Sequence, residues 1–374
     1  MRIAVDAMGG DRAPSSVVEG AVLAANDFDL EVVLVGQQDA VERELESHKA
    51  RNSRIRIVHA SQTVSMSSSP SSSLKKKDTS MRVAFEMMKR GEVEAVVSAG
   101  NSGAMMAMGM FILKKLPNVE RPAILVVLPA TVGKGPVLID GGANTECKPH
   151  HLVQFGIMGS IYSEKVLGVP RPRVGVLSNG EEDGKGTDLT RAANEQLRAT
   201  SLNTIGYVEG RDITNNSVDV IVCDGFTGNV VLKTVEGVAT WVVNVLKDAF
   251  MQTHLSKVGL FLSRSSLRAA YHRMDYAEYG GAPLIGLDGV VIIAHGGSSP
   301  KAIKNAIRVA RESVYHNVNR HIIDALEHNI NGAEGRESNL TSRVWKQIRS
   351  KIDTLGDKVT DETEEGKVEG GGKD

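Results

Sequence analysis

Short runs of β-branched and other apolar residues alternate along this chain with longer segments of helical periodicity. Several runs are apolar throughout, which is typical of strands covered by helices on both faces. The alternation predicts an α/β fold, a three-layer αβα sandwich around a mostly parallel, doubly wound sheet. In such a sheet, functional residues lie beyond the carboxyl ends of the strands. The expected strands cover residues 3–6, 31–36, 55–59, 95–98, 123–128, 137–140, 173–178, 203–209, 218–223 and 290–294.

Outside the strands, periodicity and composition suggest how the chain is organised. Helical periodicity is clearest over residues 230–249 and 301–327, and both helices are expected to pack on the core. Residues 1–329 are expected to form one catalytic domain. Residues 330–374 lose apolar density and end in a Glu-, Gly- and Lys-rich stretch, which predicts a disordered tail. Residues 65–73 hold seven serines and precede three lysines, which indicates a mobile loop with a basic edge.

Charge and cysteine usage narrow the classes of function. The 44 basic and 45 acidic residues nearly balance, so no nucleic-acid partner is expected. Cys147 and Cys223 lie far apart in sequence and outside any metal-binding pattern, so neither a disulfide framework nor a zinc site is predicted. The amino terminus lacks a signal-peptide pattern, and a cytoplasmic location is expected. The apolar stretch at 237–246 is half of the roughly 20 residues that span a bilayer, so no transmembrane helix is expected.

Two loops near the start of the chain could bind an anion. In the first, Asp6 is followed by Gly9 and Gly10, which would let the backbone approach a ligand closely. The second joins a strand to a helix and offers hydroxyl, amide and backbone N–H groups, a plausible oxyanion cradle. Its candidate residues are Ser98, Gly100, Asn101, Ser102 and Gly103. A tight turn and a helix-capping loop are the structural alternatives for the two loops.

Four later loops complete the series. One carries Asp140 and Asn144, another Asp224 and Asn229, and the last His295. In the fourth loop of the chain, residues 180–187, glycines flank Lys185, and Thr187 follows. Its spacing does not match a P-loop, but the lysine could bring a cation to an anionic ligand or a developing oxyanion. For this loop, a purely structural role is an equal alternative.

Several catalytic motifs are missing from the sequence. It has no GxGxxG fingerprint, no HExxH and no GxSxG elbow. These absences disfavour nicotinamide-dependent enzymes and serine hydrolases, and the sequence predicts no metal and no cofactor.

Taken together, the loops resemble those of the PlsX phosphate acyltransferases over about residues 1–325. The resemblance is carried by DAMGGD (6–11), SAGNSGA (98–104), GAN (142–144), KP (148–149), HLVQ (151–154), DGFTGN (224–229) and YGGA (279–282). It implies an isocitrate/isopropylmalate dehydrogenase-like αβα domain that acts as a homodimer. The implied reaction moves a fatty acyl group from acyl carrier protein to inorganic phosphate, early in phospholipid synthesis. A membrane glycerol-3-phosphate acyltransferase would then use the acyl phosphate. Arg12 departs from the family, whose members often have histidine there.

For such a reaction we expect phosphate itself to attack the thioester, because it carries substantial dianion near neutral pH and the thiol leaving group has a pKa near ~8.5. The protein would then supply positioning and charge. We assign phosphate binding to the second loop, Ser98 to Gly103, and catalysis to Lys185, Asn229 and Asn144. Further substrate contacts are assigned to Asp6, Gly9, Gly10, Asp140, Thr187, Asp224 and His295.

A basic, amphipathic segment at residues 255–274 is a candidate docking surface. It contains Lys257, Arg264, Arg268 and Arg273 and no acidic residue, with apolar residues at helical spacing beside them. Such a helix could meet the acidic carrier protein or an anionic membrane, and an ordinary solvated face is the alternative. Two other functions stay open at this point: a phosphotransacetylase that uses acyl-CoA, and a scaffold that binds carrier protein without turnover.

Overall fold

The computed structural model describes residues 1–48, 54–130, 133–267, 278 and 280–329. Contacts divide the chain into a first unit, residues 1–326, and a second, residues 327–374. Of the second unit only residues 327–329 are described, and they are helical. The predicted tail, residues 330–374, therefore lies outside the described residues.

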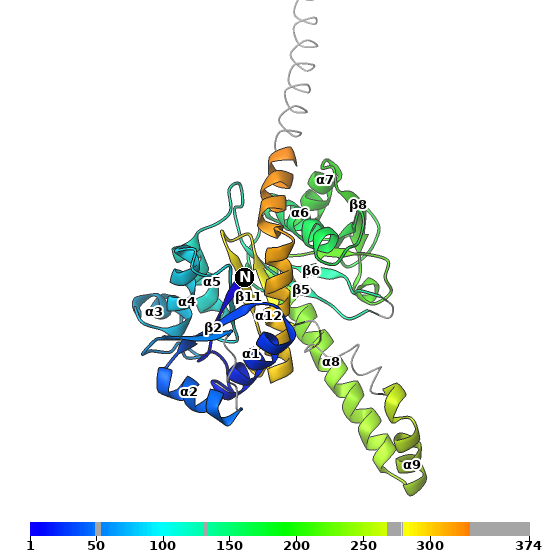
Figure 1. Ribbon diagram of the computed structural model, residues 1–374. Helices are drawn as coiled ribbons and strands as arrows, with labels where there is room; N and C mark the ends of the chain where they lie inside the picture. The colour runs from blue at the N-terminus through cyan, green and yellow to red at the C-terminus, as the bar shows by residue number, and fades with distance from the viewer. Residues whose placement is uncertain (49–53, 131–132, 268–277, 279, 330–374) are drawn as a thin grey trace, which may run out of the picture. The chain divides into compact units, whose positions relative to one another are not determined.

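Eleven described strands form one sheet in the order β3-β2-β1-β4-β11-β10-β5-β6-β9-β7-β8. Figure 1 shows helices around this sheet. Ten of them coincide with predicted runs. The eleventh, β10, was not predicted, because Pro283 interrupts its short run and glycines border it. The strands are β1 (Arg2–Asp6), β2 (Glu31–Gly36), β3 (Ile55–His59), β4 (Ala95–Ser98), β5 (Ala123–Val127), β6 (Val137–Ile139), β7 (Arg173–Leu177), β8 (Asn203–Val208), β9 (Val220–Val222), β10 (Ala282–Ile285) and β11 (Val290–Ile293).

The sheet consists of two parallel groups that run in opposite directions. β1, β2, β3, β4 and β11 are mutually parallel, and so are β6, β7, β8 and β9. Between the groups, β10 is antiparallel to β11 and to β5, and β5 is antiparallel to β6. The carboxyl ends of the two groups therefore lie at opposite edges of the sheet. The polar loops that follow the strands are therefore divided between these two edges.

Helices cover both faces of the first group. α1 (Ser15–Asp27), α2 (Gln38–Ser47) and α12 (Pro300–Tyr315) pack on one face, where Val18 and Ile307 are fully buried. α4 (Ser80–Lys89), α5 (Ser102–Met108) and the π-helix η1 (Gly109–Leu113) pack on the other, around Phe85 and Met105. This is the predicted three-layer arrangement.

The second group is covered mainly on one face. α6 (Pro149–Lys165) and α7 (Asp188–Arg198) lie there with helical residues 318–326, and Phe155 and Ile322 are fully buried. On the other face, the 3₁₀-helix η2 (Gly210–Ile213) contributes Ile213 to a smaller cluster. The helix predicted over 301–327 is divided, because α12 ends at Tyr315 and Asn317 adopts a left-handed conformation, with a φ of 47°.

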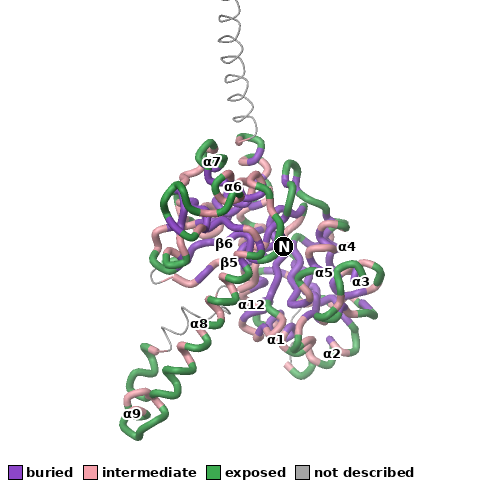
Figure 2. The backbone as a smooth tube through the Cα atoms, turned by 180° about the vertical axis from the view of Figure 1, so that it is seen from behind, coloured by how far each residue is buried: buried purple, intermediate pink, exposed green. Residues whose placement is uncertain are grey.

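α8 (Gly225–Met251) packs on the core only over its first two turns, and not along its length as expected. Only Gly225 and Gly228, in its first turn, are buried. The rest of α8, and α9 (His254–Leu262) against it, are largely exposed (Figure 2). The apolar periodicity of residues 230–249 indicates an apolar face. Val231 and Leu232 pack against the smaller cluster of the second group and α9 lies against α8, while Val238, Trp241 and Val245 stay exposed.

The length of α8 also changes one expectation from the sequence. At 27 residues, with a mean hydropathy of 1.2 over its best 18-residue window and none of that window buried, it could cross a membrane by length and composition alone. A single helix of this kind is weak evidence for a membrane span. Its first turn packs against β6 within the sheet, where Gly228 lies against the Asp140 carbonyl.

The serine-rich segment is not the irregular loop that its composition suggested. Residues Pro70–Lys75 form the short helix α3, with the Ser69 hydroxyl accepting a hydrogen bond from the Ser72 amide at its start. Ser73 is buried, and its hydroxyl donates to the Ser69 carbonyl. Serines that cap and close a short helix explain why this composition is compatible with order.

Candidate functional site

The loops after β1 and β4 meet around Asp6. The Ser98 hydroxyl donates to the Asp6 carboxylate at 2.7 Å and accepts from the Gly100 amide at 3.0 Å, and Ser80 also hydrogen-bonds to this carboxylate. A Cβ on Gly9 would lie 2.7 Å from the Asp6 carboxylate, so only glycine allows this close approach. We call Asp6, Gly9, Ser80, Ser98 and Gly100 the Asp6 cluster.

The Asp6 cluster is a buried, internally satisfied network. Burial raises the pKa of the Asp6 carboxyl, against the lowering effect of the hydrogen bonds from Ser80 and Ser98. Asp6 and Ser98 are both buried, so neither presents a free polar atom to a ligand. In this arrangement they position the glycine-rich backbone that surrounds them.

Asn101 has a structural role in this conformation. Its side-chain oxygen accepts from the Ala104 amide and caps α5, while its amide nitrogen donates to the carbonyls of Met66 at 2.6 Å and Ser68 at 3.1 Å. Ser102 and Gly103 follow as exposed residues in the first turn of α5, where backbone N–H groups have no acceptor within the helix. Of the predicted phosphate-binding residues, these two are the most accessible.

His295 lies at the same edge, after β11. The amide of Ala294 donates to the Ser98 carbonyl, and the amide of Asp11 donates to the carbonyl of Gly296 at 2.8 Å. Gly10, with a φ of 100°, fits against that same carbonyl. The first, second and last polar loops are thus brought together, with His295 exposed beside them.

At the opposite edge, Asp140 organises the loop after β6. Its carboxylate accepts five hydrogen bonds, from the backbone amides of Ile124, Gly142, Ala143 and Asn144 and from the Asn144 side chain. Burial raises the pKa of Asp140, and these donors oppose the rise. The backbone amides of this loop are therefore already used within the protein.

Asn144 and Asp224 are also held by the protein itself. The Asn144 amide nitrogen donates to the Pro122 carbonyl at 2.7 Å as well as to Asp140, and Asn144 is buried. Asp224 caps α8 by accepting from the Thr227 amide and hydroxyl. Asn229, one turn into α8, is exposed and lies against Gly142, and its side chain makes no hydrogen bond within the described residues.

Lys185 follows β7 and Asp140 follows β6. Both strands are parallel to β9, which lies between them, so the two residues lie at the same edge. Lys185 is exposed and makes no ion pair with any residue that the structure describes. Two acids of its loop are held elsewhere: Glu181 pairs with Arg211 and Asp183 with Arg198. Thr187 caps α7 through its hydroxyl, which accepts from the Thr190 amide.

The structure thus separates the predicted residues by edge. The predicted catalytic residues Lys185, Asn144 and Asn229 belong to the second group of strands, and the predicted phosphate-binding loop belongs to the first. This separation arises because β5 is antiparallel to β6. Sequence patterns within single strands and loops do not predict such a reversal.

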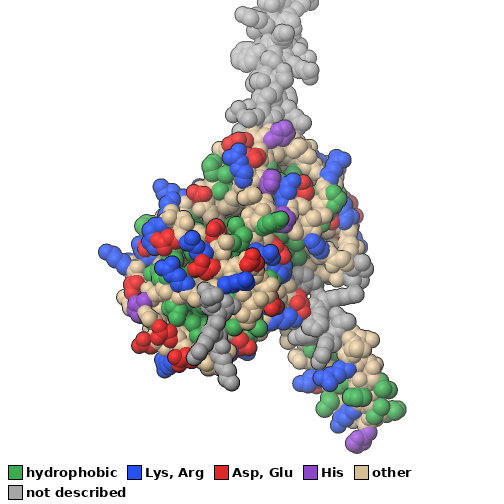
Figure 3. Space-filling model, in the orientation of Figure 1, with side chains coloured by type: hydrophobic (Ala, Val, Ile, Leu, Met, Phe, Trp, Pro, Cys, Tyr) green, Lys and Arg blue, Asp and Glu red, His purple; other side chains and the backbone are tan. Residues whose placement is uncertain are grey.

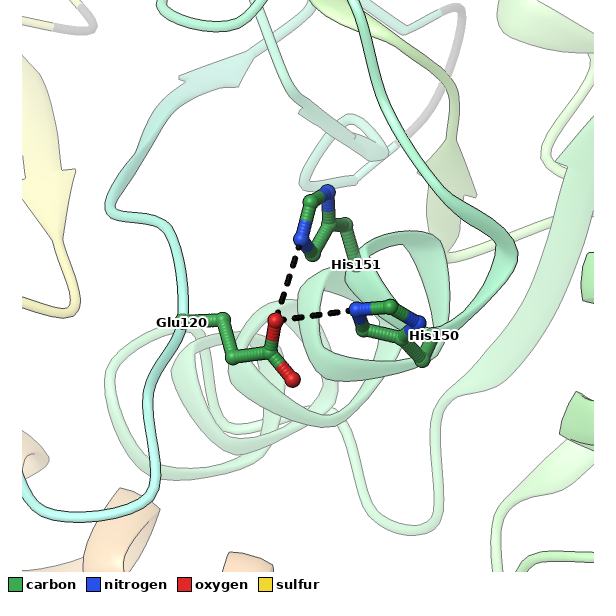
Figure 4. A group of neighbouring side chains, drawn as sticks. All are labelled: Glu120, His150 and His151. Carbon is green, nitrogen blue, oxygen red and sulfur yellow. Dashed lines mark hydrogen bonds and ion pairs between the residues drawn. The ribbon is translucent and has the colours of Figure 1, made fainter.

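One cluster escaped the sequence analysis. The Glu120 carboxylate hydrogen-bonds to the His150 ring at 2.9 Å and to the His151 ring at 3.3 Å, and these ligand atoms lie within 4.8 Å of one another (Figure 4). Burial and His150 lower the pKa of His151, while contacts with both rings lower the pKa of Glu120 despite its partial burial. The adjacent histidines at positions 150 and 151 were the available signal in the sequence.

The hydrogen bonds of this cluster favour a clamp over a metal site. The Lys148 amide donates to His151 Nδ1 at 3.1 Å, so Nδ1 is an acceptor and the neutral ring carries its proton on Nε2. A metal on Nε2 would require the proton on Nδ1 and would break this bond. Glu120 and Gln154 instead tie the segment before β5 to α6.

The predicted docking residues are described only in part. Lys257 on α9 and Arg264 beyond it are exposed, and Leu255 and Phe261 expose 82% and 73% of their surface beside them. Figure 3 shows hydrophobic and basic side chains together over α9. Arg268 and Arg273 lie outside the described residues.

Comparison with known proteins decides the family. A family model described as "Fatty acid synthesis protein" matches residues 1–321. The phosphate acyltransferase of Geotalea uraniireducens is 55% identical over 330 residues, covering 88% of this chain and 95% of its own. That of Geobacter sulfurreducens is 53% identical over 328 residues, covering 87% and 94%. The chain belongs to the phosphate acyltransferase family. The resemblance seen in the sequence is confirmed, and the chain is an acyltransferase enzyme.

Solved structures support the fold of this phosphate acyltransferase family member. A phosphotransacetylase from Streptococcus pyogenes aligns with a TM-score of 0.58 at 14% identity, covering 84% of this chain and 94% of its own. A branched-chain phosphotransacylase from Enterococcus faecalis aligns with a TM-score of 0.55 at 13% identity, covering 84% and 99%. At such low identity the likeness shows the α/β fold alone.

The cysteines of this acyltransferase are not activated as nucleophiles. Burial, together with the charges of Asp140 and Asp224, raises the pKa of the half-buried Cys147 thiol to about 11. The same causes raise the pKa of Cys223, which is buried. Since the thiolate is the reactive form, neither residue is suited to carry the acyl group.

Proposed function

We propose that this enzyme transfers a fatty acyl group from acyl carrier protein to inorganic phosphate, as an early step of phospholipid synthesis. A phosphate oxygen attacks the thioester carbonyl, the carbon–sulfur bond breaks, and the carrier leaves as a thiolate that takes up a proton. The products are acyl phosphate and free carrier protein. We further propose that a membrane glycerol-3-phosphate acyltransferase consumes the acyl phosphate.

The observation that carries the proposal is the pair of unengaged polar groups at one edge of the sheet. Lys185 and Asn229 follow neighbouring strands, and neither is paired within the described residues. An ammonium and a carboxamide with no internal partner can stabilise the oxyanion that forms when phosphate adds to the thioester. Together with cysteines that remain protonated, this favours direct attack by phosphate over a covalent acyl-enzyme.

Ser102 and Gly103, at the other edge, are proposed to bind phosphate. Attack on a thioester held at Lys185 and Asn229 requires both edges to reach one reacting centre, which coupled effects of Ser102 and Lys185 substitutions would show. Ser102 and Gly103 are the exposed members of the predicted loop, and Ser98 and Asn101 hold them in place through buried or capping hydrogen bonds. Asn144 and Asp140 fix the loop after β6, and Gly142 of that loop lies against Asn229.

The test is to incubate the enzyme with fatty acyl carrier protein and phosphate, trap acyl phosphate as a hydroxamate and titrate the released thiol. We expect equal amounts of both products, formed only when phosphate is present. A donor competition with acyl-CoA separates the nearest alternative, since a phosphotransacetylase would prefer the CoA thioester. Carrier binding without either product would support the scaffold and refute the proposal.

A peripheral, cytoplasmic-side contact with membrane and a homodimer are part of the proposal. The exposed apolar and basic residues of α9, Leu255, Lys257 and Phe261, have the composition of a helix that binds an anionic lipid surface. The exposed apolar residues of α8, among them Val238 and Trp241, form a face that a second copy could cover. The mass of the enzyme in solution, measured by light scattering, tests the dimer.

A further inference from the structure

Three lysines at the carboxyl-terminal end of α3 form an exposed basic segment. Lys75, Lys76 and Lys77 are all exposed. Residues 61–77 contain these three lysines and no Asp or Glu. The Lys76 ammonium donates to the Thr63 carbonyl, whereas Lys75 and Lys77 make no hydrogen bond or ion pair with the residues that the structure describes.

This basic segment is fixed at both of its ends to the loops after β1 and β4. On the amino-terminal side, the Asn101 side chain holds the carbonyls of Met66 and Ser68, and Gly103 lies against Pro70. On the carboxyl-terminal side, Lys77 is three residues before Ser80, which begins α4 and hydrogen-bonds to Asp6. α3, which ends at Lys75, packs against α5, the helix in whose first turn Ser102 and Gly103 are exposed.

The surface around the lysines is polar. Ser71 and Ser72 are exposed on α3, and Met66 is the large hydrophobic residue that residues 61–77 expose. A lipid surface is bound by basic residues that accompany exposed apolar side chains, as on α9. Lysines among serines, held in place by hydrogen bonds, instead suit an acidic protein surface that is recognised by charge.

We propose that Lys75 and Lys77 are part of the docking surface for the acidic acyl carrier protein, on the helix that packs against α5 and the predicted phosphate-binding loop. This inference rests on the proposed function, because it takes the carrier protein as the acyl donor. It assigns carrier recognition to α3 and its lysines and leaves α9 to the membrane. Lys76 is left out, since it holds the segment to Thr63.

The experiment compares wild-type enzyme with Lys75→Glu/Lys77→Glu, using labelled acyl carrier protein in an anisotropy titration and acyl transfer kinetics at low salt. We expect the Kd and the KM for the carrier to rise about tenfold, with the difference shrinking as salt screens the charges. The KM for phosphate and the kcat should stay within about twofold, because Lys75 and Lys77 make no hydrogen bond or ion pair with the described residues proposed to bind phosphate.

A matched charge control is Arg56→Glu/Lys89→Glu. Both residues are exposed. Arg56 lies at the start of β3 and Lys89 in the last turn of α4, so both lie near the amino-terminal ends of the first group of strands, away from the loops that follow β1 and β4. The inference would be overturned if the control weakened carrier binding as much as the α3 variant does, or if the α3 variant bound carrier as wild type does. It would also be overturned if the α3 variant raised only the KM for phosphate. Wild-type enzyme that binds carrier but forms no acyl phosphate would instead sink the proposed function and leave the docking site standing.

Discussion

Asn144 shows how a residue with catalytic chemistry can have a structural role. Its side chain donates to the Pro122 carbonyl and to Asp140, both inside the protein. Asn144→Ala would leave a buried carbonyl and one carboxylate oxygen short of a donor, which typically costs about 1–3 kcal/mol. We expect that loss in the free energy of unfolding, measured by urea denaturation.

Asn229→Ala is the matched control for Asn144. Asn229 is exposed and makes no hydrogen bond within the described residues, so its removal should change stability by less than about 0.5 kcal/mol while it slows turnover. An Asn144→Ala enzyme that is as stable as wild type but inactive would show that Asn144 contacts substrate directly.

Lys185 is the residue with the clearest catalytic prediction. Since Lys185 makes no ion pair with the residues that the structure describes, its charge is available to the reacting centre. Lys185→Ala should lower kcat by a factor on the order of 10²–10³ with little change in melting temperature. Lys185→Arg should restore activity only in part, because the planar guanidinium places its donors differently. Near wild-type turnover of Lys185→Ala at saturating substrates would make the loop structural.

Lys185 and Ser102 lie at opposite edges of the sheet. A double-mutant cycle tests whether they act on one reacting centre. Ser102→Ala should raise the KM for phosphate, and if both residues act on one reacting centre, the effects of the two substitutions on kcat/KM should be coupled. Strictly additive effects would show that the two edges act independently, and phosphate would then have to bind beside Lys185.

At the scale of elements, local patterns predicted most of the strands but not their surroundings. The β-branched runs were sufficient for ten strands because a buried strand needs apolar side chains on both faces. β10 was missed because proline and glycine obscure a strand that only its neighbours β11 and β5 stabilise. α8 was predicted as a helix but expected in the core, since periodicity shows that a face is apolar and not what covers it.

The α9 helix carries the prediction at this scale. Lys257 and Arg264 are exposed beside Leu255 and Phe261, and a basic residue near an anionic membrane is worth about 1 kcal/mol. Lys257→Glu/Arg264→Glu should therefore weaken binding to anionic vesicles by roughly thirtyfold or more, while urea denaturation stays unchanged. Vesicle sedimentation measures the binding, and neutral vesicles are the control. Equal binding of variant and wild type to anionic vesicles would assign these charges to another partner.

At the scale of the whole molecule, the reversal of strand direction is the feature that the sequence could not reveal. The strands of each group could be predicted from the sequence. The aspartates that follow β1 and β6, each in a loop with glycine, could be predicted as well. The relative direction of the groups depends on β10 and β5, whose pairing is a long-range contact without a local signal. From the sequence, Lys185 and Ser102 were therefore assigned to one site. The strand order places them at opposite edges and does not support that assignment.

The carboxyl-terminal end of the chain carries the last prediction. Val318, Ile322 and Leu326 are buried against the second group of strands, so the helical residues 318–326 belong to the core. Residues 331–374 are mostly polar or charged and lack the apolar content to extend that core. Removing residues 331–374 should leave turnover within about twofold and thermal unfolding nearly unchanged. Removing residues 316–374 is the contrasting variant, because each buried side chain it deletes contributes about 1.5–3 kcal/mol, and this protein should unfold or aggregate. Loss of most activity in the shorter deletion, measured by acyl phosphate formation, would show that residues beyond 330 take part in function.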